Sequence, residues 1–260
     1  MYRVTETPTS HGTPVPDADA FAAQRDAWRR GMAADEAIRA DAVALQVDAE
    51  GHHYTYQREW GGVPIIRLPD DIVVFQELVW DYRPQRIVET GIARGGSLLL
   101  NAAMQRMVGL EPSVLGIDVA IFPHTRTMID GHPLAVGVEM LESDSTIDTA
   151  VSATRNFLGD AERAILVLDS NHTHAHVLAE LRALAPLLPV GSFVLVADTI
   201  VEEFPAGHYQ DRDWDRGNNP MTAARAFVEE RDDFVLDLDW SRRALVTEFR
   251  DGILVRTAGA

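Results

Sequence analysis

Residues 86–97 read RIVETGIARGGS, and the order of residue types in this stretch decides the fold. Its first four residues form a short apolar strand, and its last glycines begin a helix predicted over residues 95–107. Glycine tolerates backbone dihedrals that other residues avoid and lets a ligand approach closely. The helix start adds free N–H groups. The stretch therefore predicts a ligand-binding turn between a strand and a helix.

The glycine spacing indicates which ligand this turn accepts. It is not G-x-G-x-x-G, so the fingerprint of dinucleotide sites is not met. Glu89 stands two residues before Gly91, and an acid at that place is typical of adenosylmethionine sites. Its carboxylate suits the positive ammonium and sulfonium of that cofactor. The alternative is a helix-capping turn of any α/β domain, because such turns recur across doubly wound folds.

Outward from this turn, apolar strands alternate with helices. Strands are predicted at residues 86–89, 114–118, 138–141, 164–168, 193–197, 234–238, 244–249 and 253–255. Helices are predicted at residues 70–80, 95–107, 147–157, 174–187 and 221–230. Continuous apolar strands separated by helices imply a parallel sheet buried on both faces. The Asp251-Gly252 pair is a strong tight-turn signal, so the sheet should finish in an antiparallel hairpin.

This pattern predicts an α/β, Rossmann-like class I methyltransferase fold with a mostly parallel seven-stranded sheet. Residues 1–16 read as mobile, and residues 18–47 read as a helical arm with apolar residues at roughly helical spacing. The aromatic-rich residues 54–66 read as a loop or lid. We therefore divide the chain into an arm and lid over 1–60 and a catalytic domain over 61–260. The arm is expected to pack on that domain or on a second subunit, which indicates a homo-oligomer.

Composition excludes several classes of function. The 260 residues carry a formal net charge of −17, which disfavours nucleic acids and anionic membranes as partners. The chain has no cysteine, so thiolate nucleophiles, Fe–S clusters and the usual zinc knuckles are excluded. The N-terminal stretch lacks an apolar core of signal-peptide length, and no stretch reaches the length of a spanning helix. We expect a cytoplasmic protein.

Two further acids follow strands that flank the glycine turn. Asp118 ends the second strand, where cofactor-binding α/β folds place a carboxylate that accepts hydrogen bonds from ribose hydroxyls. Asp144 lies in a Ser-Asp-Ser run after the third strand, where adenine contacts usually fall in this fold. The alternatives are an ordinary loop aspartate at Asp118 and a plain Asx-turn at Asp144.

A carboxylate–histidine cluster follows the fourth strand, where ILVLDSNHTHAH spans residues 165–176. Asp169 ends that strand and Asp198 ends the next one, at the sheet edge where open α/β sheets bind ligands. Two neighbouring carboxylates suit a hard divalent cation such as Mg²⁺. A hydroxyl bound to the cation loses its proton more easily, and His172 is the first choice to accept it. His174, predicted to begin the next helix, is the second choice.

Other interpretations of this cluster stay open. The aspartates could be solvated loop residues or helix caps. His172, His174 and His176 could form a zinc or iron site, although H-x-H-x-H across a strand–helix junction does not aim three rings at one point. The long connection over residues 200–220 is typical of a lid or binding loop. Its aromatic residues could close over an acceptor or simply pack.

The combination VETGIARGGS, LDSNHTH, ADT and GNNP resembles the cephalosporin hydroxylase / rhamnosyl O-methyltransferase family from about residue 54 to the end. The combination is far more specific than any one of its parts. The resemblance implies a class I, adenosylmethionine-dependent and metal-dependent O-methyltransferase acting on sugars or other natural products. It implies cofactor contacts from Glu89, Gly91, Ser97 and Asp118.

The resemblance also implies metal ligation by Asp169 and Asp198. Relatives can carry two adjacent acids at the end of the fifth strand, whereas Ala197 precedes Asp198 here. Glu202, Glu203 or water would then supply the third ligand, and Glu202 is the predicted one. The expected reaction is direct methyl transfer to a hydroxyl activated by Mg²⁺ and deprotonated by His172. The rival functions are a metal-dependent natural-product hydroxylase, a non-catalytic adenosylmethionine-binding partner and a nicotinamide oxidoreductase, the last disfavoured by the glycine spacing.

Overall fold

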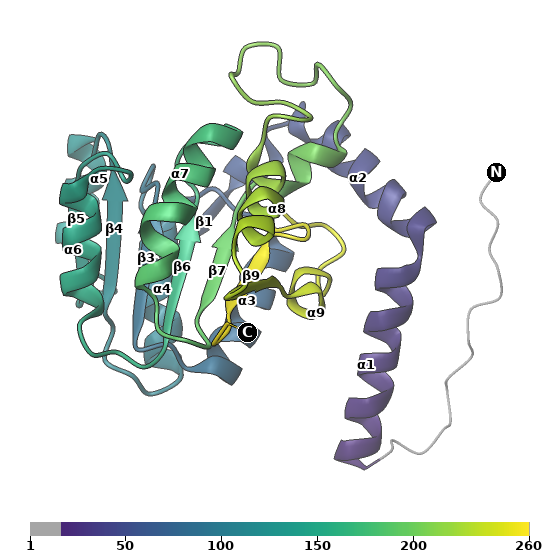
Figure 1. The fold of residues 1–260 in the computed structure, drawn as a ribbon, viewed down its shortest axis with the longest axis horizontal. Coiled ribbons are helices and arrows are strands. Elements are labelled where there is room, and N and C mark those ends of the chain that lie inside the picture. Colours follow the sequence, from purple (N-terminus) through teal and green to yellow (C-terminus); the bar gives the residue numbers. More distant parts are fainter. Residues whose placement is uncertain (1–16, 260) are drawn as a thin grey trace.

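The N-terminal arm predicted to be helical over residues 18–47 consists of two helices. The computed structural model describes residues 17–259, so the prediction for residues 1–16 lies outside the described part. Helices α1 (Ala18–Ala34) and α2 (Glu36–Glu50) meet at Asp35, which ends α1 and caps α2 by accepting from the N–H groups of residues 37 and 38. Aspartate favours such a cap because its short side chain satisfies the free N–H groups of the helix start. Helix α1 projects away from the sheet (Figure 1).

The aromatic-rich stretch after the arm is a small hairpin, where the sequence predicted a loop or lid. A 3₁₀ turn (η1, Tyr54–Gln57) leads into strands β1 (Arg58–Trp60) and β2 (Val63–Ile65), which pair antiparallel. Gly61 and Gly62 make the turn with φ of +60° and +84°. The hairpin contacts helix α4 (Gly96–Met107).

The main sheet has seven strands, as predicted. Its strands are β3 (Arg86–Thr90), β4 (Val114–Asp118), β5 (Val138–Glu142), β6 (Ala164–Leu168), β7 (Phe193–Val196), β8 (Phe234–Leu236) and β9 (Ile253–Arg256). Their order is β5-β4-β3-β6-β7-β9-β8, and β9 pairs antiparallel with both of its neighbours. The strand β3 that precedes the glycine turn is central, so ligands at its carboxyl end lie where the sheet order reverses. The class I methyltransferase fold is therefore confirmed.

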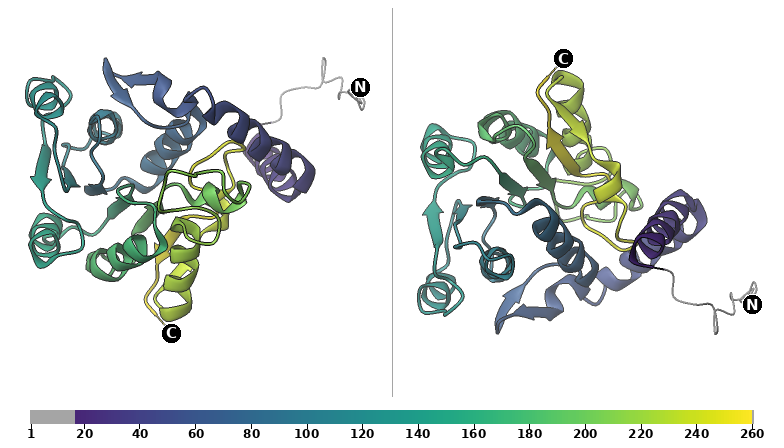
Figure 2. Two further views of the ribbon diagram at one scale, coloured as in Figure 1. Left: turned by 90° about the horizontal axis from the view of Figure 1, so that it is seen from above. Right: turned by 90° about the horizontal axis from the view of Figure 1, so that it is seen from below.

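Helices cover both faces of this sheet (Figures 1 and 2). One face carries α6 (Asp148–Leu158), α7 (His174–Leu184) with the 3₁₀ turn η2 (Ala185–Leu187), and α8 (Pro220–Glu230). The other face carries α3 (Pro69–Tyr82) and α4. Three shorter helical segments lie in connections: α5 (Pro123–Asp130), η3 (Thr199–Glu203) and α9 (Leu238–Ser241). None of the helices in residues 17–259 is long and apolar enough to span a membrane.

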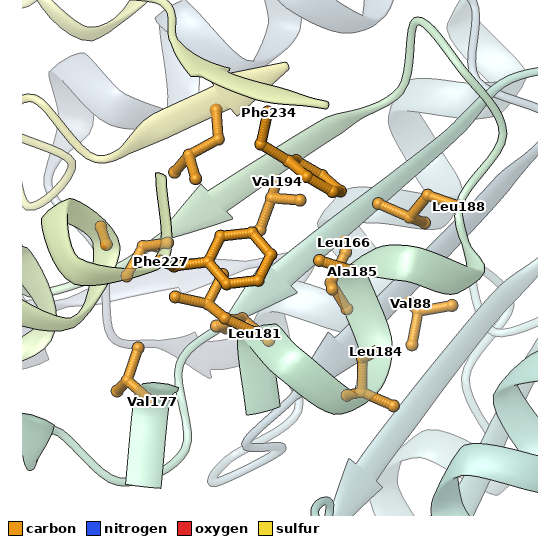
Figure 3. Packing of buried hydrophobic residues seen from close by; sticks show 14 of the residues in the cluster. Val88, Leu166, Val177, Leu181, Leu184, Ala185, Leu188, Val194, Phe227 and Phe234 are labelled. Carbon is orange, nitrogen blue, oxygen red and sulfur yellow. The ribbon is translucent and has the colours of Figure 1, made fainter. Parts of the chain in front are cut away.

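The core on the α7–α8 face explains why these strands are continuously apolar. Strand residues such as Leu166 and Val194 pack against Leu181 of α7 and Phe227 of α8 (Figure 3). All four side chains are fully buried. Burying a side chain of this size contributes about 1.5–3 kcal/mol. All five residues of β6 are buried, so packing on both faces holds the strand in place. The position of Asp169, the residue directly after the strand, follows from this packing.

The predicted strand over residues 244–249 is absent, so the predicted hairpin around Asp251-Gly252 is wrong. The antiparallel pair is β8 with β9. The backbone of the 244–249 segment bonds to a helix instead of a neighbouring strand: Asp71 of α3 accepts from the Glu248 N–H at 2.8 Å and from the Thr247 hydroxyl. This anchoring turns Glu248 towards the carboxyl edge of the sheet, where it lines the main cavity.

Candidate active site

The glycine turn and the end of β6 lie against one another. Gly91 has φ of +87°, and a Cβ built on it would lie 1.9 Å from the carbonyl oxygen of Asp169. A Cβ on Gly96 would lie 2.5 Å from the carbonyl oxygen of Pro64 in β2. Glycine is required at both places, for its conformation at the first and for close approach at both. The turn therefore joins the predicted cofactor residues to the predicted metal residues.

Glu89 lies behind this turn and holds it. Its side chain is 1% exposed and accepts hydrogen bonds from the Ser97 hydroxyl and from Asn101 Nδ2, the latter at 2.6 Å. Burial raises the pKa of Glu89, while Arg67 and these hydrogen bonds oppose the rise. Gly91 and Ser97 line the cavity directly. Asn101 was not predicted; its spacing of four from Ser97 on α4 is the signal that could have indicated it.

Asp118 and Asp144, the other predicted cofactor residues, accept hydrogen bonds from turns: Asp118 from the glycine turn and Asp144 from its own turn. Asp118 Oδ2 accepts from the N–H groups of Ile92 at 2.8 Å and Ala93 at 3.3 Å, so it braces the glycine turn. Asp144 Oδ1 accepts from the hydroxyl and the N–H of Thr146, and these bonds lower the pKa of Asp144. Asp144 therefore forms the Asx-turn that was its alternative interpretation. Neither side chain lines the main cavity.

The structure brings Asp169 and Asp198 together with His172. One ligand atom from each of the three lies within 4.8 Å of the other two. The juxtaposition follows from the parallel register, in which Leu168 of β6 lies opposite Val196 of β7. His172 Nδ1 is 3.3 Å from Asp198 Oδ2, and the His172 and Trp214 rings form a T-shaped pair with 4.8 Å between their centroids.

The predicted third ligand does not join this group. Glu202 Oε2 accepts from the Gly217 N–H at 2.8 Å and from Asn219 Nδ2 at 2.6 Å, so it holds the start of α8. Its alternative, Glu203, lies 3.6 Å from Arg39 and 3.9 Å from Arg250. Both acids therefore contact residues that are distant in the sequence, so their neighbours along the chain could not indicate these partners.

Two of the three histidines also have other partners. His174 begins α7, as predicted, and its Nδ1 is 2.8 Å from the Thr222 hydroxyl of α8. His176 lies one turn from Glu180, whose hydrogen bond raises the pKa of His176. The three rings therefore do not converge on one point, as expected, and His172 is the histidine that faces the acids.

A buried arginine that sequence reasoning missed lies beneath the acids. Arg67 is 3% exposed, its Nη2 is 3.4 Å from Asp169 Oδ2, and its guanidinium lies 5.0 Å from the ring centre of Phe249. Burial raises the pKa of Asp169 well above its usual range, Arg67 opposes the rise, and the charge of Asp198 adds to it. Burial also raises the pKa of Glu248 well above its usual range. The Arg67 guanidinium lies among the carboxylates of Glu248, Asp169 and Glu89. Acids outnumber the arginine, so the site has the chemistry to accept a cation.

A single cavity of about 550 Å³ connects these groups. The glycine turn forms one part of its wall, and Asp169, His172 and Asp198 form the next part. The predicted binding loop contributes Phe204, His208, Tyr209, Arg212 and Trp214. The end of α2 and the following turn contribute Gln46, Glu50, Gly51, His53 and Tyr56. The volume falls within the range of small-molecule sites.

Comparison with known proteins identifies relatives of this chain. A family model described as rhamnosyl O-methyltransferase/CmcI matches residues 52–257. The rhamnosyl O-methyltransferase of Mycobacterium bovis (strain BCG / Pasteur 1173P2) is 27% identical over 201 residues, which are 75% of this chain and 76% of the relative. The chain is similar to an apo structure of CmcI with a TM-score of 0.58 and 20% identity, covering 78% of each chain. It is similar to a CmcI structure with Mg and SAM with a TM-score of 0.55, the same identity and the same coverage.

Proposed function

The chain belongs to the rhamnosyl O-methyltransferase/CmcI family of adenosylmethionine-dependent O-methyltransferases, and from that membership we propose that it methylates a hydroxyl of a sugar or other natural product with the help of a divalent cation. The observation that carries the proposal is the group of Asp169, His172 and Asp198 beside the Gly91 turn, within one cavity. Methyl donor, cation and acceptor would meet there within a few ångströms of the same sheet edge.

The glycine turn would hold the cofactor. The methyl donor supplies a sulfonium whose methyl group is the one transferred. Gly91 allows the cofactor to approach the backbone, Ser97 faces it from the helix start, and buried Glu89 supplies negative charge behind both. Asp118 contributes by bracing the turn through the N–H groups of Ile92 and Ala93. Asp144 is left out of the proposed site because its carboxylate is used in its own turn.

Asp169 and Asp198 would hold the cation. Their oxygens are ligands that Mg²⁺ prefers. Burial raises the pKa of Asp169 and the nearby charge of Asp198 adds to the rise, so a cation between the two carboxylates would be favourable. A divalent cation at this place supplies Lewis acidity that makes a nearby hydroxyl more acidic. The related fold of CmcI with Mg and SAM supports the same choice of ion. Water or the acceptor would complete the coordination.

His172 would accept the proton of the acceptor hydroxyl. His172 Nδ1 lies 3.3 Å from Asp198 Oδ2, so the carboxylate would orient the ring and Nε2 would face the acceptor as the proton-accepting nitrogen. Trp214 fixes the same ring from its edge. Proton removal and charge stabilisation would then converge on one oxygen, so that positioning supplies most of the rate.

The rival functions have weaker support. An iron-dependent hydroxylase would use several histidines, but His174 and His176 are directed at α8 and at Glu180. A non-catalytic partner would not need a histidine held between a carboxylate and an aromatic ring beside the predicted metal ligands.

We also propose the division into an arm and lid over residues 1–60 and a catalytic domain over residues 61–260, and that the arm supports self-association. Helix α1 has no buried residue and exposes Phe21 and Trp28, whose rings contact one another. Light scattering of the full chain should report an oligomer, and a monomer at micromolar concentration would refute this part.

The proposed function is tested by methyl transfer from isotope-labelled adenosylmethionine to a panel of glycosides and phenols, with and without Mg²⁺. We expect label in product with the native chain and Mg²⁺, and none with Asp169→Asn. Asp160→Asn, an exposed aspartate before β6, is the matched control and should keep full activity. Transfer that is unaffected by chelation or by Asp169→Asn would refute the metal-dependent part of the proposal.

A further inference from the structure

Two side chains on the inner face of α2 line the cavity opposite the glycine turn. Gln46 and Glu50 are four residues apart, so they lie one above the other on the same face of the helix. Gln46 is 7% exposed. Its Nε2 donates to the carbonyl oxygen of Thr247 at 3.3 Å, while its Oε1 has no hydrogen-bond partner among the described residues. A buried carbonyl oxygen without a partner is costly, so it calls for a donor.

Glu50 adds a second acceptor to the same wall. Its carboxylate lies near the phenol of Tyr209, which lines the same cavity from the binding loop. A carboxylate has about four lone-pair sites, so one neighbouring phenol leaves most of its capacity free. Gln46 Oε1 and the Glu50 carboxylate therefore provide two acceptors on this wall, which suit a ligand that donates at two places.

The remaining walls restrict the ligand further. Tyr56, Tyr209 and Trp214 supply aromatic surface suited to the apolar face of a ring. Glu50 and Glu248 add two acidic side chains to the proposed metal ligands Asp169 and Asp198. Arg94 of the glycine turn and Arg212, whose guanidinium lies 5.2 Å from the Trp214 ring centre, are the arginines of the lining, so acids outnumber arginines there by four to two. This excess of acids disfavours an anionic ligand, because like charges at close range cost several kcal/mol.

The inner face of α2 also lies outside the part of the chain that is shared with the family. The family match covers residues 52–257, which includes the glycine turn and the three residues of the metal group. Gln46 and Glu50 precede it. The half of the cavity that would hold cofactor and cation therefore lies within the matched range, whereas this wall lies outside it. Residues in such a position are suited to select the acceptor.

We propose that Gln46 and Glu50 form the acceptor-recognition subsite, and that it takes a neutral or cationic polyhydroxylated ring with hydroxyl or amino donors at two positions. The inference rests on the proposed function, because it assumes that the neighbouring acids and glycine turn hold cation and cofactor. The aromatic wall contacts the ring face, and the two acceptors on α2 select its donors. A ring that carries a carboxylate or phosphate is excluded.

The test is ligand-observed saturation-transfer NMR on the full chain with S-adenosylhomocysteine and Mg²⁺. The probes are methyl hexopyranosides in three matched forms: neutral hydroxyl, ammonium and carboxylate. We expect the first two forms to bind and the carboxylate form to bind at least about tenfold more weakly. Glu50→Gln should weaken the ammonium form about tenfold, because a charge-assisted hydrogen bond is lost. Gln46→Leu should weaken both binding forms.

Asp48→Asn is the matched control, since Asp48 lies on the exposed face of the same helix. It should bind all probes as the native chain does. The subsite is refuted if the carboxylate form binds as well as the others, if both α2 variants match the native chain, or if no ring binds. Calorimetry measures S-adenosylhomocysteine affinity on the native chain and on every variant, and this separates the two hypotheses. If the native chain does not bind S-adenosylhomocysteine, the proposed function is refuted. The ring-binding results test the subsite alone.

Discussion

Replacing Gly91 by alanine tests the close contact between the cofactor turn and the metal residues. The φ of +87° costs a non-glycine residue about 1–2 kcal/mol. The new Cβ would also lie 1.9 Å from the carbonyl oxygen of Asp169, which is backbone and cannot rotate away. Forcing the chain apart at a packed place costs about 1–3 kcal/mol more. We therefore expect Gly91→Ala to lower the free energy of unfolding by about 2–5 kcal/mol.

Gly62 provides a matched control for this experiment. Its φ is +84°, but a Cβ built there meets nothing within 4 Å. Gly62→Ala should therefore cost only the backbone strain, about 1–2 kcal/mol. Urea denaturation measures both costs, and calorimetry should show weaker S-adenosylhomocysteine binding for Gly91→Ala alone. Equal destabilisation of the two variants, with cofactor binding intact in both, would refute the contact.

Three further substitutions test other parts of the site. Arg67→Met should lower the free energy of unfolding by about 3–5 kcal/mol in urea denaturation, because it removes the buried cation beside Glu248, Asp169 and Glu89; a loss below about 1 kcal/mol would contradict this role. Burial raises the pKa of Asp71 to about 6, above its unfolded value of 3.8, so its contribution to stability is full below pH 4 and is lost as the pH rises through 6. The difference in unfolding free energy between native chain and Asp71→Asn should therefore change over that pH window, and a constant difference would disprove it. Glu202→Gln should leave Mg²⁺ affinity unchanged in calorimetry, because Glu202 bonds to Gly217 and Asn219; a tenfold loss would restore it as a ligand.

Local sequence patterns were sufficient for the parallel part of the sheet and for the place of its functional acids. Strands such as β6 are apolar on both faces, so they are recognisable without knowledge of their neighbours. Parallel strands that are adjacent in the sheet end at the same edge, which is why Asp169 and Asp198 could be placed together before any coordinates. The positions of strand ends do not give the directions of side chains. Glu202 was therefore predicted as a metal ligand, although its carboxylate bonds to Gly217 and Asn219.

The remaining features depend on contacts between distant parts of the chain. Arg67 follows an aromatic-rich stretch and resembles a loop residue, yet the fold buries it against Asp169, which lies 102 positions later in the sequence. Residues 244–249 have strand-like composition, but Asp71 of α3 takes their hydrogen bonds. Gln46 lies on a weakly patterned helix, and only the folded chain brings it to the cavity. Tertiary contacts of this kind override local propensity.

The central claim is that Asp169 and Asp198 hold one divalent cation beside the cofactor turn. Calorimetric titration of Mg²⁺ into the chain saturated with S-adenosylhomocysteine tests it most directly, with Asp169→Asn and Asp198→Asn as variants. The account predicts one cation bound by the native chain and affinity at least about tenfold weaker in each variant, with cofactor binding retained. Equal cation affinity in the native chain and both variants, or no cation binding by the native chain, would contradict it.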